Sequence, residues 1–301
     1  MELYKYVPPE RVDILENLYI RFTQPSSLND PGEFSVQIKK LINDDTLENT
    51  LDEGFEKGLE HATMIENLQK EFKNSLNMEF SKKDCEQFYN LLLEKQPNFF
   101  EEIVPQLKNL LTNVVKVSEP NIIKNFKTNI KDIMGVLSLS ECNNDFKMWS
   151  HYGSNHSGFI IILNRNHQFF KRYDTIDSER YKLKKVTYSS KIPISENLCE
   201  DLTDEKIFFT KGEDWKHEKE WRIIRPLEKS ENTIEINEEK IHLFKLPSDL
   251  IKGVIFGYKC CQEKRDEIKS IISNNRRIDE FIFQEAILDE NEYRIIIKDI
   301  I

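Results

Sequence analysis

Two glutamates separated by one residue, Glu218 and Glu220, form the most chemically informative pair in the sequence. They lie in a stretch, residues 211–225, that also holds two of the three tryptophans of the chain. Carboxylates held close together repel each other, which raises the pKa of one of them. Such a pair can carry out acid/base chemistry or hold the hydroxyls of a ribose. The residues leave open a second interpretation, a solvated edge strand on which Arg222 pairs with a glutamate.

The residues around Glu220 predict a strand that would present both glutamates on one face. The run Trp-Arg-Ile-Ile is rich in strand formers and leads to Pro226, which would end a strand. Side chains alternate between the two faces of a strand. One face is therefore expected to hold Glu218, Glu220, Arg222 and Ile224. The other face is expected to hold His217, Lys219, Trp221, Ile223 and Arg225.

A second polar and aromatic group, Ser150-His151-Tyr152 with His156 after it, lies between two apolar segments that predict strands. Residues 146–152 predict a short helical turn between these strands. Loops at the ends of strands are frequent positions for binding and catalytic residues. His151 could act as a hydrogen-bond donor or base, and Tyr152 as a stacking surface. In the alternative interpretation this is a structural turn in which His151 only hydrogen-bonds the backbone.

Residues 2–36 predict a strand, a short helix, a second strand and a polar loop. The two strands carry three aromatic side chains, Tyr4, Tyr6 and Phe22. Each aromatic could line a site, and core packing is the alternative for each.

The chain as a whole predicts an α+β core interrupted by a helical insertion. Residues 37–130 are rich in Glu, Lys, Leu and Asn, and we expect them to form a helical insertion that acts as a lid or a partner-binding element. Residues 1–36 and 131–301 are expected to form one domain of mixed, mostly antiparallel sheets. Helical periodicity recurs over residues 36–42, 46–68, 84–93, 99–115, 202–209 and 263–274. Strands are expected over residues 133–140, 158–163, 186–188, 233–236, 241–246, 250–256 and 293–297.

Composition excludes several classes of protein. The 301 residues carry a net charge of −10, which is unlike a general nucleic-acid-binding surface, although a local basic groove stays open. Only nine glycines are present, and no Gly-x-Gly-x-x-Gly or Walker-type loop occurs. The five cysteines include no Cys-x-x-Cys pair, which indicates a reduced protein. We find no signal peptide and no long apolar run, and we therefore expect a cytoplasmic protein without membrane spans. No metal site is expected, and the oligomeric state is open.

Five motifs together resemble a bacterial family, the domain-of-unknown-function family 2971. They are Leu-Tyr-Lys-Tyr at residues 3–6, the segment 22–31 ending in Asn-Asp-Pro, Met-Trp-Ser-His-Tyr-Gly-x-x-His-x-Gly at 148–158, Trp-Lys-His-Glu-Lys-Glu-Trp-Arg at 215–222, and Ile-Phe-Gly at 255–257. The motifs span nearly the whole chain apart from the helical insertion. The name of this family implies no reaction.

The order of these motifs is also similar to that of the ADP-ribosyltransferase superfamily. That resemblance implies a split sheet, a cleft that binds NAD as a substrate, and a late-strand glutamate that holds the ribose 2′-hydroxyl. It implies that Glu220, His151 and Tyr152 are catalytic. It implies that the residues that bind NAD are Tyr6, Phe22, Ser150, His156, Lys211, Glu218 and Arg222. A toxin or phage-defence effector that modifies a protein or a nucleic acid would fit this activity.

Two other functions stay open at the level of the sequence. In the first, His151, His156, Lys211, Glu218 and Glu220 assemble one acid/base site of a nuclease or nucleotide hydrolase. In the second, the protein is a non-catalytic binding module whose three tryptophans form a packing core and whose helical insertion recruits a partner.

Overall fold

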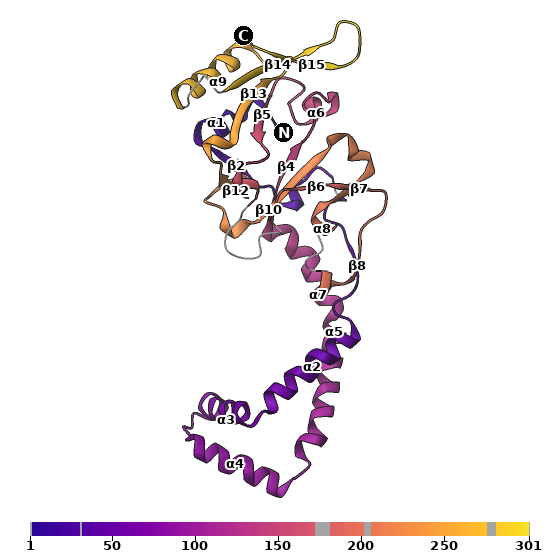
Figure 1. Cartoon of the computed structure of the whole chain (residues 1–301), viewed down its shortest axis with the longest axis vertical. Helices are drawn as coiled ribbons and strands as arrows, with labels where there is room; N and C mark the ends of the chain where they lie inside the picture. Colours follow the sequence, from indigo (N-terminus) through magenta and orange to yellow (C-terminus); the bar gives the residue numbers. More distant parts are fainter. Residues whose placement is uncertain (1, 31, 172–180, 202–205, 276–280, 301) are drawn as a thin grey trace. The chain divides into compact units, whose positions relative to one another are not determined.

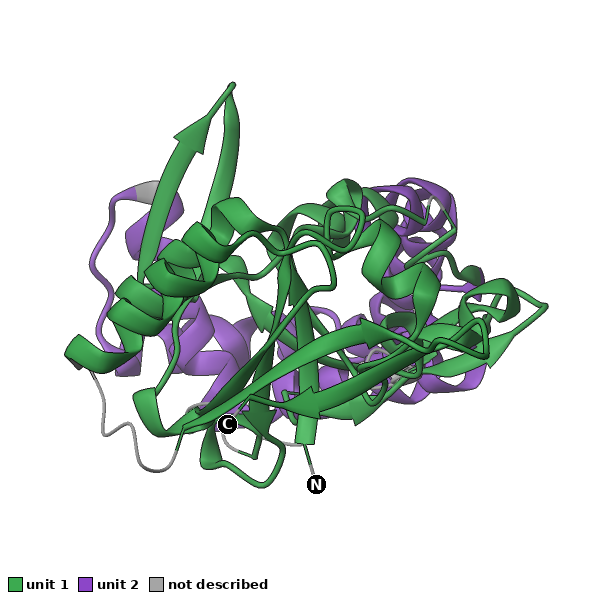
Figure 2. Ribbon diagram, turned by 90° about the horizontal axis from the view of Figure 1, so that it is seen from above, with its two compact units in different colours: residues 1–37, 127–194, 203–301 green, residues 38–126, 195–202 purple. Residues whose placement is uncertain are grey.

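The computed structural model describes residues 2–30, 32–171, 181–201, 206–275 and 281–300 (Figure 1). The chain divides into two compact units (Figure 2). The first unit comprises residues 1–37, 127–194 and 203–301, and the second comprises residues 38–126 and 195–202. None of the helices in the described part of the chain combines the length and the apolar composition that a membrane crossing requires.

The first unit is built on an eight-stranded sheet with the strand order β15-β14-β13-β5-β1-β4-β10-β6. Neighbouring strands are antiparallel except for β13 and β14, which are parallel, so the fold is α+β with mostly antiparallel pairing, as the sequence predicts. The strands are β1 (Glu2–Val7), β4 (Met134–Ser140), β5 (Phe159–Asn164), β6 (Lys184–Lys185), β10 (Glu220–Pro226), β13 (Ile251–Phe256), β14 (Ile282–Leu288) and β15 (Ile295–Asp299).

The sheet is nearly split between β1 and β4. Strand β1 pairs with β5 along six residues, and β4 pairs with β10 along seven. Between β1 and β4, in contrast, the register holds only the pair Tyr4 and Ser140. Beyond that pair the segment after β2 replaces β1, because Thr23 and Val136 exchange backbone hydrogen bonds of 2.9 Å. The strands therefore separate where Lys5 and Tyr6 would otherwise meet the middle of β4.

Apolar side chains cover both faces of this sheet. On β5 alternate residues face opposite sides, since Ile161 belongs to one buried cluster and Ile160 to the other. The larger cluster packs α1 (Asp13–Asn17) and α9 (Gln262–Asn275) onto one face through Ile14 and Ile268. The smaller cluster contains Tyr6 and Trp149, the latter from α6 (Phe146–His151). The helical turn predicted between the two apolar strands is thus present.

Smaller elements complete the first unit. A three-stranded sheet consists of β2 (Tyr19–Arg21), β12 (Glu239–Lys245) and β11 (Asn232–Ile236). A parallel pair consists of β7 (Thr187–Ser189) and β9 (Thr210–Gly212). Short 3-10 helices are η1 (Pro9–Val12), η2 (Pro25–Ser27), η3 (Gln168–Phe170), η4 (Glu213–Glu218), η5 (Leu227–Lys229) and η6 (Ser248–Leu250). Of the helix predicted over residues 202–209, only α8 (Lys206–Phe209) lies within the described residues.

The second unit is mainly helical, but three of the predicted helical segments differ from the structure, and the segment 46–68 is divided at Glu60 between two helices. Its helices are α2 (Asp44–Leu59), α3 (His61–Leu76), α4 (Lys82–Lys95), α7 (Leu198–Asp201) and most of α5 (Phe99–Ile133). Residues 36–42, predicted as helical, instead contain β3 (Gln37–Lys40), which pairs with β8 (Ile194–Asn197). That partner is distant in the sequence, so helical periodicity could not reveal it. Helix α5 also continues through Pro120 instead of ending near residue 115.

Candidate functional site

A cavity of about 220 Å³ lies where β1 and β4 separate. Strand β1 contributes Tyr4, Lys5 and Tyr6, and β4 contributes Val136, Ser138, Leu139 and Ser140. The other lining residues are Thr23, Ser27, Leu28, Asn29 and Glu33 from the segment after β2, Met148 and Tyr152 from the region of α6, and Lys211, Glu218 and Glu220. Segments that are far apart in the sequence therefore meet in one polar cavity.

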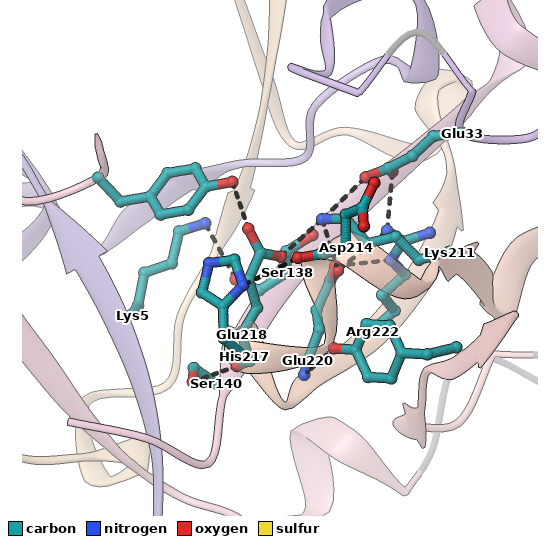
Figure 3. A network of polar contacts seen from close by, with 12 residues as sticks. Lys5, Glu33, Ser138, Ser140, Lys211, Asp214, His217, Glu218, Glu220 and Arg222 are labelled. Atoms are coloured by element: carbon teal, nitrogen blue, oxygen red, sulfur yellow. Dashed lines mark hydrogen bonds and ion pairs between the residues drawn. The ribbon is translucent and has the colours of Figure 1, made fainter. Parts of the chain in front are cut away.

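Lys211, at the centre of β9, holds three carboxylates together at the wall of this cavity (Figure 3). Its Nζ lies 2.6 Å from an oxygen of Glu218, 3.1 Å from one of Glu220 and 2.9 Å from one of Glu33. Burial alone would lower the pKa of Lys211, but the three carboxylates outweigh burial and raise it. Lys211 is therefore a fixed positive charge, and the carboxylates cannot separate without losing it.

Arg222 provides the second positive charge of this network from the middle of β10. Its Nε donates to Glu220 at 2.6 Å and its Nη2 to Glu33 at 2.7 Å, while Nη1 donates to the backbone oxygen of Phe208 at 3.1 Å. The side chain is 0% exposed. A completely buried guanidinium requires such a full set of acceptors, because an unpaired buried charge is strongly unfavourable.

The backbone brings Glu218 and Glu220 together in a way that the sequence did not predict. Glu218 is the last residue of η4 and does not lie on the strand, which begins at Glu220. Between them Lys219 adopts a left-handed conformation with φ 44° and ends the 3-10 helix. Ser140 supports this turn, because its Oγ donates to the backbone oxygen of Glu218 at 2.6 Å. The expected alternation is therefore wrong for Glu218, although both side chains reach Lys211.

Within β10 itself the predicted alternation is present. Trp221 and Ile223 contact the larger apolar cluster, whereas Glu220 and Arg222 join the ionic network. The interpretation of this segment as a solvated edge strand is wrong, because Glu220 is 3% exposed and β10 pairs with both β4 and β6. The ion pair between Arg222 and a glutamate, part of that same interpretation, is present.

Repulsion between neighbouring carboxylates does not by itself set the pKa values of Glu220 and Glu33. Burial would raise the pKa of Glu220, but Arg222 and Lys211 outweigh it and lower this pKa to about 2. Glu33 has the opposite balance, since burial raises its pKa more than Arg222 and Lys211 lower it. The loop before β3 thus contributes a carboxyl whose pKa is raised.

Two predicted tyrosines line the cavity and hold fixed positions. Tyr152, the residue after α6, donates its hydroxyl to Glu218 at 2.7 Å, and burial together with this carboxylate raises its pKa. Tyr6 donates to the backbone oxygen of Cys142 at 2.9 Å, and its ring packs edge-on against Trp149 with the ring centres 5.2 Å apart. Both phenols therefore stay protonated at neutral pH.

The other predicted residues lie outside this cavity. His156 is buried, its Nε2 is 3.1 Å from the Oγ of Ser150, and its ring stacks on Trp149 with the ring centres 6.5 Å apart. His151 is exposed and lines a neighbouring hollow. Phe22 is completely buried against Phe244, as the core-packing interpretation of this aromatic expects. The predicted site is therefore only partly assembled.

Two charged residues that line the cavity, Lys5 and Glu33, were not among the predicted site residues. The Nζ of Lys5 donates to the backbone oxygen of Ser138 at 3.0 Å, and burial lowers the pKa of Lys5 to about 8. The position of Lys5 could have been noticed, because it shares one face of its strand with Leu3 and Val7, which belong to the larger core. Nothing in the sequence near Glu33 distinguishes it from other acidic loop residues.

One comparison with known proteins matches part of the chain to a family model. Residues 148–223 match the family described as "Protein of unknown function (DUF2971)". This match supports the resemblance seen in the sequence, and the matched stretch includes Tyr152, Lys211, Glu218, Glu220 and Arg222. Comparison with curated proteins and with solved structures gave no match.

Proposed function

We propose that this protein cleaves the bond between nicotinamide and ribose in NAD and transfers ADP-ribose to an acceptor on a protein or a nucleic acid. The observation that carries the proposal is the cavity in the split sheet, where buried carboxylates and phenols meet. A split sheet with a late carboxylate in the cleft is also what the similarity to the ADP-ribosyltransferases implies.

The chemistry requires a negative charge close to C1′ of the ribose. When the C1′–N bond breaks, its electron pair moves to the nicotinamide nitrogen, and positive charge develops on the ribose carbon and ring oxygen. A nucleophile of the acceptor then bonds to C1′ and loses its proton to water. A carboxylate fixed beside this cationic state stabilises it without having to reorganise, which is the most effective form of electrostatic catalysis.

We assign the substrate-facing role to Glu218 instead of Glu220, because of the bonds that each side chain already makes. The carboxylate of Glu220 accepts hydrogen bonds from Nε and Nη2 of Arg222 and from Lys211. Among the described residues, Glu218 accepts one bond at each oxygen, from Tyr152 and from Lys211. Glu218 therefore has acceptor capacity left for a ribose hydroxyl, and Glu220 keeps the two cations in position.

The size of the cavity limits which part of NAD it could hold. Its volume of about 220 Å³ is below the roughly 300–1,000 Å³ of pockets for drug-sized ligands. The cavity would therefore take the nicotinamide riboside end, with Tyr6 and Tyr152 as aromatic walls, and the rest of the dinucleotide would lie outside. Tyr4 adds a third phenol to the same wall.

The alternative functions receive less support from the arrangement of the side chains. A nuclease or nucleotide hydrolase with a shared His/Glu site requires histidines at the carboxylates, but neither His151 nor His156 lines the cavity. A binding module with one tryptophan core is not favoured either. Trp149 and Trp221 contact different apolar clusters, which lie on opposite faces of the sheet.

Incubation with NAD labelled in the nicotinamide ring tests the proposal. We expect the protein to release free nicotinamide, and Glu218→Gln to lower kcat by about 100-fold or more, because it removes the charge and keeps the shape. Glu213→Gln, at the exposed start of η4, is the matched control and should leave the rate unchanged. Thermal unfolding of each variant checks that it is folded. If the wild-type protein neither binds NAD nor releases nicotinamide, the proposal is wrong.

A further inference from the structure

A second hollow adjoins the cavity in the split sheet, and Lys5 lines both. The two share Lys5, Tyr6, Thr23 and Tyr152. The second hollow, of about 390 Å³, adds cationic and titratable side chains from three further places: Arg11 from η1, Arg21 from β2 and His151 from α6. Lys5 therefore lines a hollow to which two arginines also contribute.

The cations of the second hollow remain accessible to an anionic ligand. Arg11 pairs with Asp13 at 2.9 Å, and the two side chains are 33% and 46% exposed. Arg21 pairs with Glu239 at 2.5 Å, and no hydrogen-bond partner within the described residues reaches its buried Nε. Neither acidic partner lines the hollow. Half-exposed ion pairs contribute little to the stability of a protein. A bound phosphate could therefore accept hydrogen bonds from these guanidinium groups without a large loss of stability.

Lys5 differs in kind from Lys211, the other lysine of the cavity. Lys211 is held by three carboxylates, whereas the ammonium of Lys5 donates to one backbone oxygen, that of Ser138 (Figure 3). Burial, together with a smaller effect of Arg11, lowers the pKa of Lys5 to about 8, and Glu220 and Glu218 oppose this only in part. About half of the Lys5 amines are then neutral at pH 8, and a neutral amine is the nucleophilic form.

We propose that Lys5 forms an imine with a carbonyl compound that carries a phosphate group, with the phosphate lying in the hollow beside Arg11 and Arg21. The amine nitrogen bonds to the carbonyl carbon, the carbonyl oxygen takes up two protons, and water leaves as the C=N bond forms. No oxidant or reductant is consumed. The ligand class is a phosphorylated aldehyde, which includes sugar phosphates in their open-chain form. The proposal does not depend on the cleavage of NAD.

Pyridoxal 5′-phosphate is a suitable probe, because it carries both an aldehyde and a phosphate. The full-length protein is incubated with it, the imine is reduced with borohydride, and the labelled peptides are identified by mass spectrometry. We expect Lys5 to be labelled at lower probe concentrations than any other lysine, and the labelling to increase as the pH rises through 8. Pyridoxal without the phosphate should need at least about fivefold higher concentrations.

Two variants separate the contributions of the amine and of the phosphate-binding cations. Arg21→Ala should raise the half-saturating concentration of pyridoxal 5′-phosphate about fivefold, a loss of roughly 1 kcal/mol, and leave labelling by pyridoxal unchanged. Lys5→Met should remove the preferred label. If Lys5→Met does not fold, inorganic pyrophosphate added to the wild-type protein should protect Lys5 from the probe. Uniform labelling of surface lysines, or equal labelling of Lys5 by pyridoxal and its phosphate, would overturn the proposal.

Discussion

Replacement of Lys211 by methionine tests whether the ionic network is held together as described. The substitution keeps the length and much of the volume of the side chain but removes the charge that contacts Glu33, Glu218 and Glu220. After it, Arg222 is the only cation that contacts these carboxylates within the described residues. The side chains concerned are at most 5% exposed, so water cannot replace the missing charge.

The expected effect is large compared with the stability of an ordinary domain. Breaking a buried ion pair by removing one partner destabilises a protein by about 3–5 kcal/mol, because a charge stays buried without compensation. Total unfolding free energies are roughly 5–15 kcal/mol. Lys211→Met should therefore lower the unfolding free energy by about 3–5 kcal/mol at pH 7, unless a carboxyl takes up a proton and reduces the loss.

The pH dependence of the stability loss shows whether a carboxyl of the network takes up a proton. In the variant, the carboxyl pKa values of the folded state rise above those of the unfolded chain, so the penalty is complete at high pH and disappears as the pH falls below about 4. Denaturant unfolding at pH 7 and at pH 4.5 should show a smaller loss at the lower pH. Lys216→Met is the matched control, because Lys216 pairs with Glu213 at 3.7 Å with both side chains more than half exposed. It should change the stability by less than about 0.5 kcal/mol. An equally small effect of Lys211→Met would refute the reasoning.

Three further predictions follow from single residues. Arg222 and Lys211 lower the pKa of Glu220 from 4.5 to about 2, which contributes about 3 kcal/mol to the unfolding free energy above pH 4.5. This contribution should be lost as the pH falls toward 2. Glu220→Gln should therefore flatten this part of an acid-unfolding curve. Gly158→Ala should destabilise the protein by about 2 kcal/mol or more in denaturant unfolding, since the new Cβ would lie 2.2 Å from the backbone oxygen of Val7. Gly54→Ala, inside α2 with no atom within 4 Å of the new Cβ, should instead stabilise its helix by about 0.5–1 kcal/mol, measured by the same unfolding experiment.

Elements that follow from local patterns could be predicted from the sequence. The strands β4 and β5, with α6 between them, were expected from two apolar runs separated by a polar helical turn. Strand β3 was not, because its pairing partner β8 lies more than 150 residues away in the sequence. Periodicity reports how one segment buries its own side chains, and it contains no information about a distant strand that provides hydrogen bonds.

The candidate site shows the same limit. Glu218, Glu220 and Tyr152 stand in dense polar and aromatic motifs, and all three line the cavity. Glu33 could not be predicted, since only the folded loop places it against Lys211 and Arg222. The histidines were expected at the site because of their residue type, but their environment decides otherwise: His156 packs between Phe146 and Trp149.

The gap between β1 and β4 is lined by charged side chains. Two cations, Lys211 and Arg222, contact three carboxylates beside it, and Lys5 lines the same cavity. Apolar side chains of similar volume would stabilise a fold as well as such a network does, or better. At this gap the ammonium of Lys5 occupies the backbone oxygen of Ser138, and Thr23 pairs with the backbone of Val136, so β1 does not continue its ladder along β4. The charged groups therefore line this cavity at some expense of stability, which is the arrangement that the proposed function requires.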